Sequence, residues 1–232
     1  MLSLRFDRAG MQPGPSGVVL STPVFSESLV GARLTAGWNV LPPGVAMPPN
    51  AHAPAEVYVV MSGRGEVTVG EHSAPVGPLD SVFIAPHLRH QIRPTGPQEL
   101  AWFALAFPTS TPCQDLPSAG VPLCPFDPAR LKAAHQATFY WSPTFSRQQI
   151  GAPIDLGWGL VHSGVASELH RHQTAEVYVF VQGQAIMQVG QEALAVAPGD
   201  CAFVPAQGLH CVTNVSGADV LLYWYEFIPG TV

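Results

Sequence analysis

Short runs of apolar residues, separated by glycine and proline, recur along most of the chain from residue 32 onward. Runs of this length with turn residues between them predict β-strands, and their regular recurrence predicts an all-β sandwich or barrel. Residues 1–17 are polar and rich in glycine and proline, which predicts a loop or a loosely held arm. Short edge strands are expected at residues 18–20 and 24–25. The clearest strand candidates are residues 56–61, 65–69, 81–85 and 100–107.

The segment 109–128 interrupts this rhythm. It is dense in proline, serine and threonine and has no periodic apolar face, so it predicts a linker. Asp127 followed by Pro128 is typical of a helix start, and we predict one short helix over residues 129–137. The β rhythm then returns. The chain is therefore expected to divide into an N-terminal module with its arm, a linker with a helix, and a C-terminal module, at residues 1–110, 111–137 and 138–232.

The second module repeats the first at a constant offset of 120 residues. Residues 55–59 and residues 175–179 both read Ala-Glu-Val-Tyr-Val, and residues 44–46 and 164–166 both read Gly-Val-Ala. Single identical residues, such as His90 and His210, continue the match without a gap. A repeat of this kind indicates an internal duplication rather than chance. The two modules should therefore share one fold.

Two histidines and a glutamate of the second module have a spacing that is typical of metal ligands. His170, His172 and Glu176 follow the pattern His-x-His-x-x-x-Glu, and strand alternation places the two histidines on one face. A short turn after His172 would return Glu176 to that face. Imidazoles and a carboxylate that converge on one point predict a site for a transition metal, and His210 is a fourth candidate ligand.

These residues resemble the motifs of the cupin superfamily. The first cupin motif reads G-x5-H-x-H-x3-E-x6-G and the second reads G-x5-P-x-G-x2-H-x3-N. The resemblance implies a small antiparallel barrel that holds a metal through three histidines and one glutamate. With the duplication, it implies two tandem cupin barrels (double-stranded β-helix or jelly-roll). The matching residues are Gly164, His170, His172, Glu176 and Gly183 for the first motif and Gly199, Pro205, His210 and Asn214 for the second, with Gln207 at the inner glycine.

The first module departs from the motif at Asn50, which stands at the position of the first histidine, while His52, Glu56 and His90 remain. Two imidazoles and one carboxylate are also the facial set of iron(II) oxygenases. Asn50 is then either a weak oxygen ligand or a residue that leaves a coordination position to water. A degenerate module that is retained for packing is the other interpretation.

The ligand types suit several divalent metals, namely iron, manganese, nickel, cobalt, copper and zinc. The resemblance to cupin enzymes favours iron(II) or manganese. Two further residues are candidates for catalysis. Glu168 lies two residues before His170 and is a possible general base, or else a solvated strand end. Tyr178 lies two residues after Glu176 and should point into the barrel, where it either orients a substrate or serves as a core aromatic residue.

The resemblance implies a metal-dependent enzyme that acts on a small organic molecule, and an oxygenase is our first expectation. An isomerase, lyase or cyclase is the alternative. A hypothesis of another class is a non-catalytic sensor of a ligand or metal. The complete ligand set of the second module favours an enzyme, because cupins that serve as storage proteins usually lack these metal ligands.

Composition narrows the possible partners. Hydrophobic residues make up 47% of the chain and charged residues only 11%, which provides a sizeable core and suggests surface buried in a homodimer. The net charge of −6 and the lack of a run of lysine and arginine argue against nucleic acid and anionic membranes. The N-terminal residues contain acidic residues, glycine and proline where a signal peptide needs an apolar run, and no apolar run in the chain is long enough to span a membrane, so we expect a cytoplasmic protein. The four cysteines form no C-x-x-C pair and are expected to be free thiols.

Overall fold

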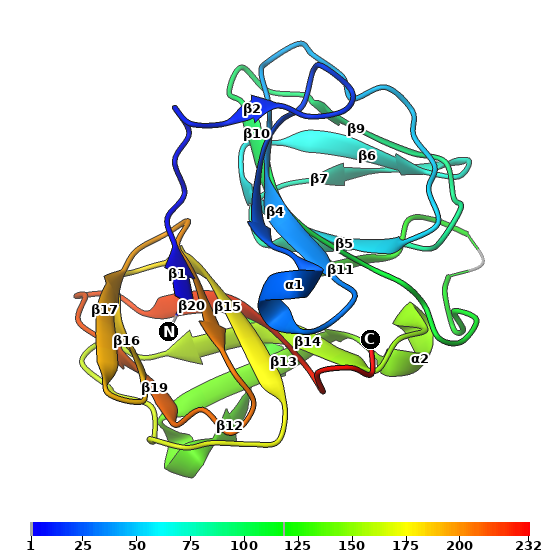
Figure 1. Ribbon diagram of the computed structural model, residues 1–232. Helices are drawn as coiled ribbons and strands as arrows, with labels where there is room; N and C mark the ends of the chain where they lie inside the picture. Colours follow the sequence, from blue (N-terminus) through cyan, green and yellow to red (C-terminus); the bar gives the residue numbers. More distant parts are fainter. Residues whose placement is uncertain (1, 118) are drawn as a thin grey trace.

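A computed structural model describes residues 2–117 and 119–232; Met1 and Ser118, which belong to the predicted arm and linker, lie outside this part. The predicted fold class is confirmed. The chain is almost entirely β and forms two barrels of antiparallel strands that lie side by side (Figure 1). Each barrel consists of one seven-stranded sheet and one three-stranded sheet. No helix in the described residues is long and apolar enough to cross a membrane.

The N-terminal barrel contains β2 (Gln12–Pro13), β3 (Leu20–Phe25), β4 (Thr35–Leu41), β5 (Ala55–Ser62), β6 (Gly65–Val69), β7 (His72–Val76), β8 (Asp80–Ile84), β9 (His90–Pro94), β10 (Leu100–Phe107) and β11 (Leu123–Pro125), with the short helix α1 (Glu27–Val30) after β3. Its large sheet has the order β11-β8-β5-β10-β4-β3-β2, and its small sheet has the order β7-β6-β9.

The C-terminal barrel contains β1 (Leu2–Leu4), β12 (Lys132–Ala134), β13 (Phe139–Phe145), β14 (Ile154–Val161), β15 (Ala175–Gln182), β16 (Ala185–Val189), β17 (Glu192–Val196), β18 (Cys201–Val204), β19 (His210–Asn214) and β20 (Val220–Phe227), with the short helix α2 (Arg147–Ile150) after β13. Its large sheet has the order β1-β18-β15-β20-β14-β13-β12, and its small sheet has the order β17-β16-β19.

The offset of 120 residues holds in three dimensions. It carries β5, β6, β7, β9 and β10 onto β15, β16, β17, β19 and β20 with the same first and last residues. The strand orders also correspond, except that the outer strands β11 and β1, which pair with β8 and β18, are not related by the offset. The duplication in the sequence is therefore a duplication of structure, and the shared strands have direct counterparts in the two barrels.

The helix predicted over residues 129–137 is wrong. This segment forms a 3-10 turn (Pro128–Arg130), strand β12 and a second 3-10 turn (His135–Ala137). The start signal itself is present, because the Asp127 carboxylate accepts a hydrogen bond from the Ala129 amide. No apolar stripe follows to bury a helix, whereas the edge of β13 offers unpaired backbone groups, which β12 uses. In the part of the chain that the structure describes, the α-helices are α1 and α2.

The expected arm is also more ordered than predicted. Residues 2–4 form β1, which pairs with β18 of the C-terminal barrel, and Figure 1 shows the arm reaching from one barrel to the other. The linker contributes β11, which pairs with β8 of the N-terminal barrel. The two short edge strands predicted near residue 20 are one continuous strand, β3.

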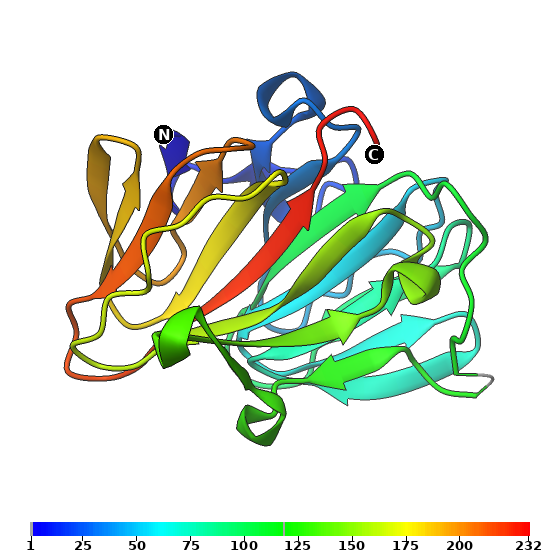
Figure 2. The same cartoon turned by 90° about the horizontal axis from the view of Figure 1, so that it is seen from below.

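Three apolar cores hold the molecule together. One fills each barrel, and the third lies between the two large sheets and includes residues of both barrels. Aromatic rings meet across this junction, with centroids 5.9 Å apart for Phe83 and Phe145 and 6.4 Å apart for Phe25 and Phe203. Figure 2 shows the two barrels lying side by side. The two copies thus pair within one chain.

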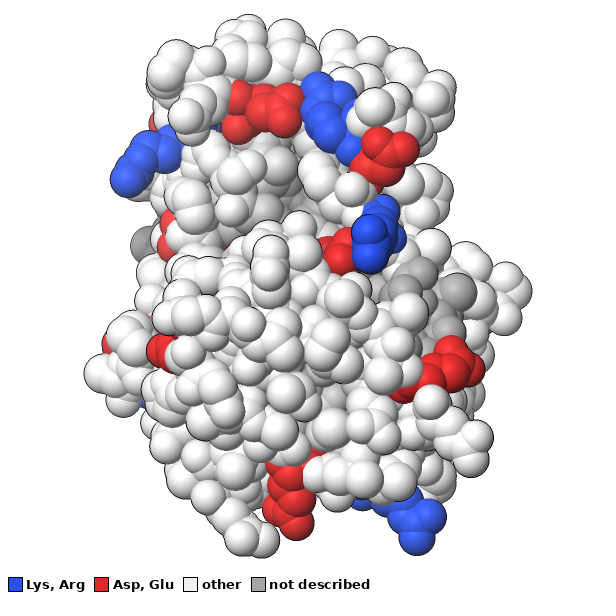
Figure 3. Space-filling model, turned by 90° about the vertical axis from the view of Figure 1, so that its left-hand side faces the viewer, with Lys and Arg blue, Asp and Glu red and all other residues white. Residues whose placement is uncertain are grey.

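A homodimer remains a prediction. The face in Figure 3 carries few charged side chains, in small separate groups with a wide uncharged area between them. Such a face agrees with the low charged fraction from which the homodimer was inferred. Light scattering at micromolar concentration tests it, and a monomer would contradict the dimer while leaving the two-barrel fold unaffected.

Close packing of β13 on β14 gives a first stability prediction. A Cβ atom on Gly157 would overlap the Ser142 carbonyl oxygen. We expect Gly157→Ala to lower the free energy of unfolding by about 1–3 kcal/mol, as overpacking typically does. Gly217→Ala is the control, because a Cβ there meets nothing within 4 Å. Urea unfolding compares the two variants, and equal midpoints would contradict the close approach of these strands.

Candidate metal centre

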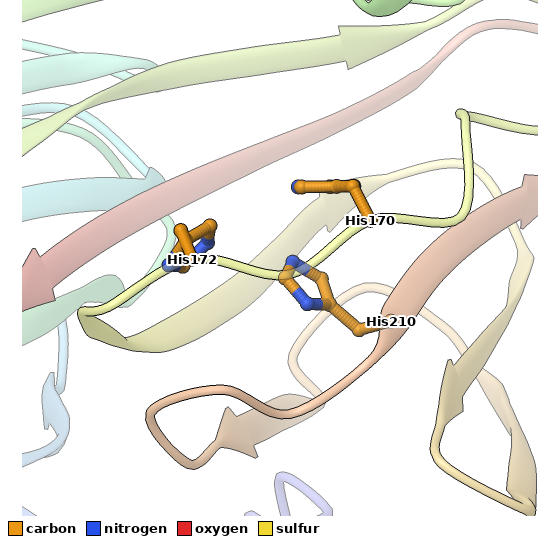
Figure 4. A group of neighbouring side chains, drawn as sticks. All are labelled: His170, His172 and His210. Carbon is orange, nitrogen blue, oxygen red and sulfur yellow. The ribbon is translucent and has the colours of Figure 1, made fainter.

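The four predicted ligands of the second module come together in space from three segments. His170 and His172 lie on the chain that enters β15, Glu176 is the second residue of β15, and His210 is the first residue of β19. The amides of His170 and His210 each donate to the carbonyl of the other, at 3.0 and 2.8 Å. The three histidine rings surround a common space (Figure 4), and one ring nitrogen of each lies within 4.8 Å of the others.

Backbone carbonyls orient all three rings. The Nδ1 atoms of His170, His172 and His210 lie 2.9, 3.1 and 2.9 Å from the carbonyl oxygens of residues 168, 174 and 208. A carbonyl oxygen only accepts, so Nδ1 carries a hydrogen and Nε2 is the nitrogen left to bind a metal. Each ring therefore presents a free nitrogen, the form in which histidine binds metals.

Glu176 completes the set from the barrel wall. One of its carboxylate oxygens lies 3.0 Å from Nε2 of His172 and 3.0 Å from Nε2 of His210. The Tyr178 hydroxyl donates to the same oxygen at 2.7 Å and lies 3.2 Å from His210. Tyr178 is buried, as expected for a residue that faces the barrel interior. Because the phenol donates its hydrogen to the carboxylate, Tyr178 orients Glu176 in this arrangement.

The electrostatics suit a cation. Burial alone would raise the pKa of Glu176, but the imidazoles of His172 and His210 outweigh it and lower this pKa to about 2. Burial lowers the pKa of His170 to about 4, so its ring is neutral near pH 7. Nε2 of His172 is buried and forms no well-aligned hydrogen bond, although a Glu176 oxygen lies 3.0 Å away. Such a buried nitrogen beside a carboxylate and two further imidazoles fits a divalent transition metal.

The first module contains a smaller version of this site. Nε2 of His52 and of His90 lie 3.2 and 3.4 Å from one carboxylate oxygen of Glu56, which also accepts a 2.7 Å hydrogen bond from Tyr58. Asn50 pairs with His90 through the backbone, but its side-chain oxygen accepts a hydrogen bond from the amide of residue 51. The three residues His52, Glu56 and His90 form a compact group without Asn50.

Restoring the missing histidine should therefore strengthen the first site. The backbone pairing of Asn50 with His90 reproduces that of His170 with His210, so an imidazole at position 50 would be attached to the backbone at the equivalent place. We expect Asn50→His to raise the metal content toward two ions per chain, because imidazole is a better ligand than a carboxamide. Metal analysis of the purified protein measures it, with Asn50→Gln as the control. An unchanged metal content in Asn50→His would contradict this expectation.

The histidines of the second module open into a cavity of 660 Å³. Its walls are largely aromatic and aliphatic, and a small number of charged groups interrupts them. Such a cavity suits a small organic molecule with an apolar body and few polar groups. The apolar lining includes Phe139, Trp141, Phe145, Leu156, Val212 and Trp224, and the charged lining outside the ligand set includes Arg147, Asp155, Arg171 and Glu226.

Glu168 lies apart from this lining. Its side chain is exposed, with the carboxylate 3.9 Å from Nδ1 of His135, while its amide donates to the Thr138 hydroxyl at 3.0 Å. His135 covers the site instead, with its ring centroid 4.0 Å from that of His170. His135 begins three successive non-glycine residues with positive φ (49°, 57° and 63°), a costly backbone conformation. The predicted role of Glu168 as general base stays a prediction.

Sequence reasoning missed Glu226, the carboxylate that does face the cavity. Glu226 lies on β20, and one of its oxygens is within 4.8 Å of ligand atoms of His172 and Glu176. Burial raises its pKa, and the neighbouring charge of Glu176 raises it further. A signal was available, because the 120-residue offset places Ala106 at this position in the first module. Charged residues that break an internal repeat are candidates for the function of one copy only.

Comparison with known proteins agrees with this geometry. A family model described as a cupin domain matches residues 37–106 and again residues 158–226. The chain belongs to the cupin family. Because the model matches twice, the chain is a bicupin, as its duplicated motifs predict. No curated protein matches the sequence significantly.

Solved structures resemble this bicupin at low sequence identity. Oxalate decarboxylase of Lactobacillus farciminis in its formate complex is 16% identical, with a TM-score of 0.73 over 99% of this chain and 86% of that one. AerE of Microcystis aeruginosa is 15% identical, with a TM-score of 0.72 over 97% and 96%. A putative glyoxylate-induced protein of Pseudomonas aeruginosa is 13% identical, with a TM-score of 0.73 over 89% and 79%. At these identities the likeness shows the fold.

Proposed function

We propose that this bicupin is a metal-dependent enzyme that binds a small organic substrate at its C-terminal site. One observation carries the proposal: three oriented imidazoles and a carboxylate meet at a cavity large enough for a small molecule. Iron(II) and manganese are the first candidates for the metal, and nickel, zinc, cobalt and copper suit the same ligands. The bound ion would act as a Lewis acid toward a substrate oxygen on which negative charge develops.

Proton transfer is the chemistry that the cavity supports best. Glu226 adds a carboxylate that lines the cavity beside the ligand set. A carboxylate in this place removes a proton from a carbon next to a substrate carbonyl and returns it elsewhere, which is the work of a general base. Trp141 and Trp224 wall the cavity and hold the apolar part of the substrate away from water. The reaction class is therefore an isomerisation or a lyase reaction.

A dioxygenase, our first expectation from the sequence, is the second candidate. The observation that favours it is the ligand set itself, since histidines with one carboxylate are the iron(II) set of oxygenases. The two candidates differ in what they require. An oxygenase consumes dioxygen and needs a metal that supports oxygen chemistry, whereas proton transfer also proceeds with redox-inert zinc and without oxygen.

The test is a screen of metal-loaded protein against small hydroxy acids, oxo acids and 1,3-diketones. Each compound is incubated in D2O with the zinc, manganese and iron(II) forms, with and without oxygen. Proton NMR then follows the loss of the hydrogen next to the carbonyl. We expect deuterium exchange or conversion with zinc under nitrogen. Turnover only with iron and oxygen would select the dioxygenase, and full activity of the metal-free protein would contradict both.

A further inference from the structure

Three carboxylates form a row across the large sheet of the C-terminal barrel. The strand register places Glu176 of β15 directly opposite Glu226 of β20, and Glu226 directly opposite Asp155 of β14. Directly opposed residues project from the same face, and like charges in such pairs destabilise a sheet unless they are neutralised. Glu176 has its two imidazoles, and Asp155 forms a two-pronged ion pair with Arg147. Glu226 stands between them.

The Glu226 carboxylate accepts a hydrogen bond from a hydroxyl group. The Thr174 hydroxyl donates to a carboxylate oxygen of Glu226 at 3.0 Å. Nδ1 of His172 lies 2.6 Å from the same hydroxyl oxygen. Thr174 has a single hydroxyl hydrogen, and Glu226 receives it, so Nδ1–H of His172 supplies the hydrogen of the second bond and shares it with the carbonyl oxygen of residue 174 at 3.1 Å. A continuous path therefore runs from the carboxylate through Thr174 to the ring, which turns its Nε2 toward the metal site.

No ion pair neutralises this carboxylate in residues 2–117 and 119–232, although the nearby charges of Arg147 and His172 partly offset its charge. Glu226 is partly buried and takes part in no ion pair of the described structure. Keeping an ionised carboxylate partly buried beside Glu176 lowers the stability of the fold. A nearby cation would offset the cost. The path through Thr174 connects Glu226 to the ligand of such a cation.

The first module serves as an internal control. Its residues at the corresponding positions are Pro54 for Thr174, Ala106 for Glu226 and Thr35 for Asp155. His52 consequently donates only to the carbonyl of residue 54, at 2.9 Å, and has no hydroxyl or second carboxylate behind it. The duplicated barrels thus share three of the four inner ligands, while the hydrogen-bonded path behind the second histidine exists in only one of them.

We infer that Thr174 and Glu226 are positioning residues of the C-terminal metal centre, where their hydroxyl–carboxylate path fixes the His172 ring and strengthens its bond to the metal. An acceptor on Nδ1–H fixes the tautomer and the ring orientation, and a charged acceptor increases the basicity of the nitrogen that binds the ion. The C-terminal site is then the tighter of the two sites, for a reason beyond its additional histidine. This inference rests on the proposed metal centre.

Cobalt(II) titration of the full-length protein tests the path, with equilibrium dialysis for affinity and the visible absorption of the bound ion for ligand geometry. The variants are Glu226→Gln, Thr174→Val and the two combined, and Thr174→Ser is the control that keeps the hydroxyl. His172→Ala reports the N-terminal site alone. Thermal unfolding of each metal-free variant checks that it is folded.

We expect Glu226→Gln and Thr174→Val each to weaken cobalt binding at the C-terminal site by 10- to 100-fold, the usual effect of losing an outer partner of a ligand histidine. Thr174→Ser should stay within about threefold of the wild type. Since both residues act through one path, the combined variant should be no weaker than the weaker single variant. The absorption of Thr174→Val should shift, because its ring is no longer fixed.

Two results would overturn the inference. Wild-type affinity in folded Glu226→Gln and Thr174→Val would show that the path does not act on the metal. Losses that multiply in the combined variant would show that the two residues act separately. The proposed function fails differently, because wild-type protein would then bind no more cobalt than His172→Ala does.

Discussion

Replacing His210 by alanine is expected to empty the C-terminal metal site while the barrel remains folded. The side chain is completely buried, and its Nε2 lies 3.0 Å from the Glu176 carboxylate. Losing an inner ligand should weaken metal binding by more than the 10- to 100-fold typical of an outer partner. The fold should persist because the apolar core of this barrel is formed by other residues. Metal analysis and circular dichroism measure the two effects.

His90→Ala is the matched control, because His90 occupies the same position in the first barrel and contacts Glu56 in the same way. This variant should retain the metal of the second barrel. A folded His210→Ala protein that still holds one tightly bound ion per chain would contradict the assignment, and so would loss of that ion from His90→Ala. The combination of Glu176→Ala with His210→Ala provides a stricter version, since it removes both contacts to the carboxylate.

The inner ligands were accessible from sequence because the signal is local. His170, His172 and Glu176 lie within seven residues of one another, and His210 stands at the histidine of the second cupin motif. The strands followed for the same reason, since each is a short apolar run between turn residues. Five strand pairs then fall on the predicted offset residue for residue.

The outer part of the site depends on strand register, which the sequence does not reveal. Glu226 lies 50 residues after Glu176 and meets it only because β20 pairs with β15 in one particular register. Glu168 is close to the ligands in sequence, yet its carboxylate lies beside His135 and does not itself line the cavity. The strand β1 was missed for a related reason, because its partner β18 is almost 200 residues away. Sequence proximity therefore pointed to Glu168, whereas strand register places Glu226 at the cavity.

These two carboxylates give the prediction that bears most directly on the reaction. With a substrate from the deuterium screen, we expect Glu226→Gln to lower the rate of conversion by about 100-fold or more, as removal of a general base does. Glu168→Gln should change the rate little, because its carboxylate lies outside the lining of the cavity. The comparison is well matched, since both substitutions replace a carboxylate by an amide of the same shape. Metal content must be measured in both proteins and equalised by excess metal, because Glu226 also affects metal binding.

The pattern of rates then selects the mechanism. A large loss in Glu226→Gln at saturating metal, together with loss of deuterium exchange, supports proton transfer by the carboxylate that faces the cavity. A large loss in Glu168→Gln alone would return the role of base to the residue that sequence reasoning favoured, and would require His135 to move and admit its carboxylate. Equal rates in both variants, with turnover that depends on iron and oxygen, would contradict a carboxylate base and favour the dioxygenase. Each result follows from one pair of proteins, which differ only in the carboxylate that is neutralised.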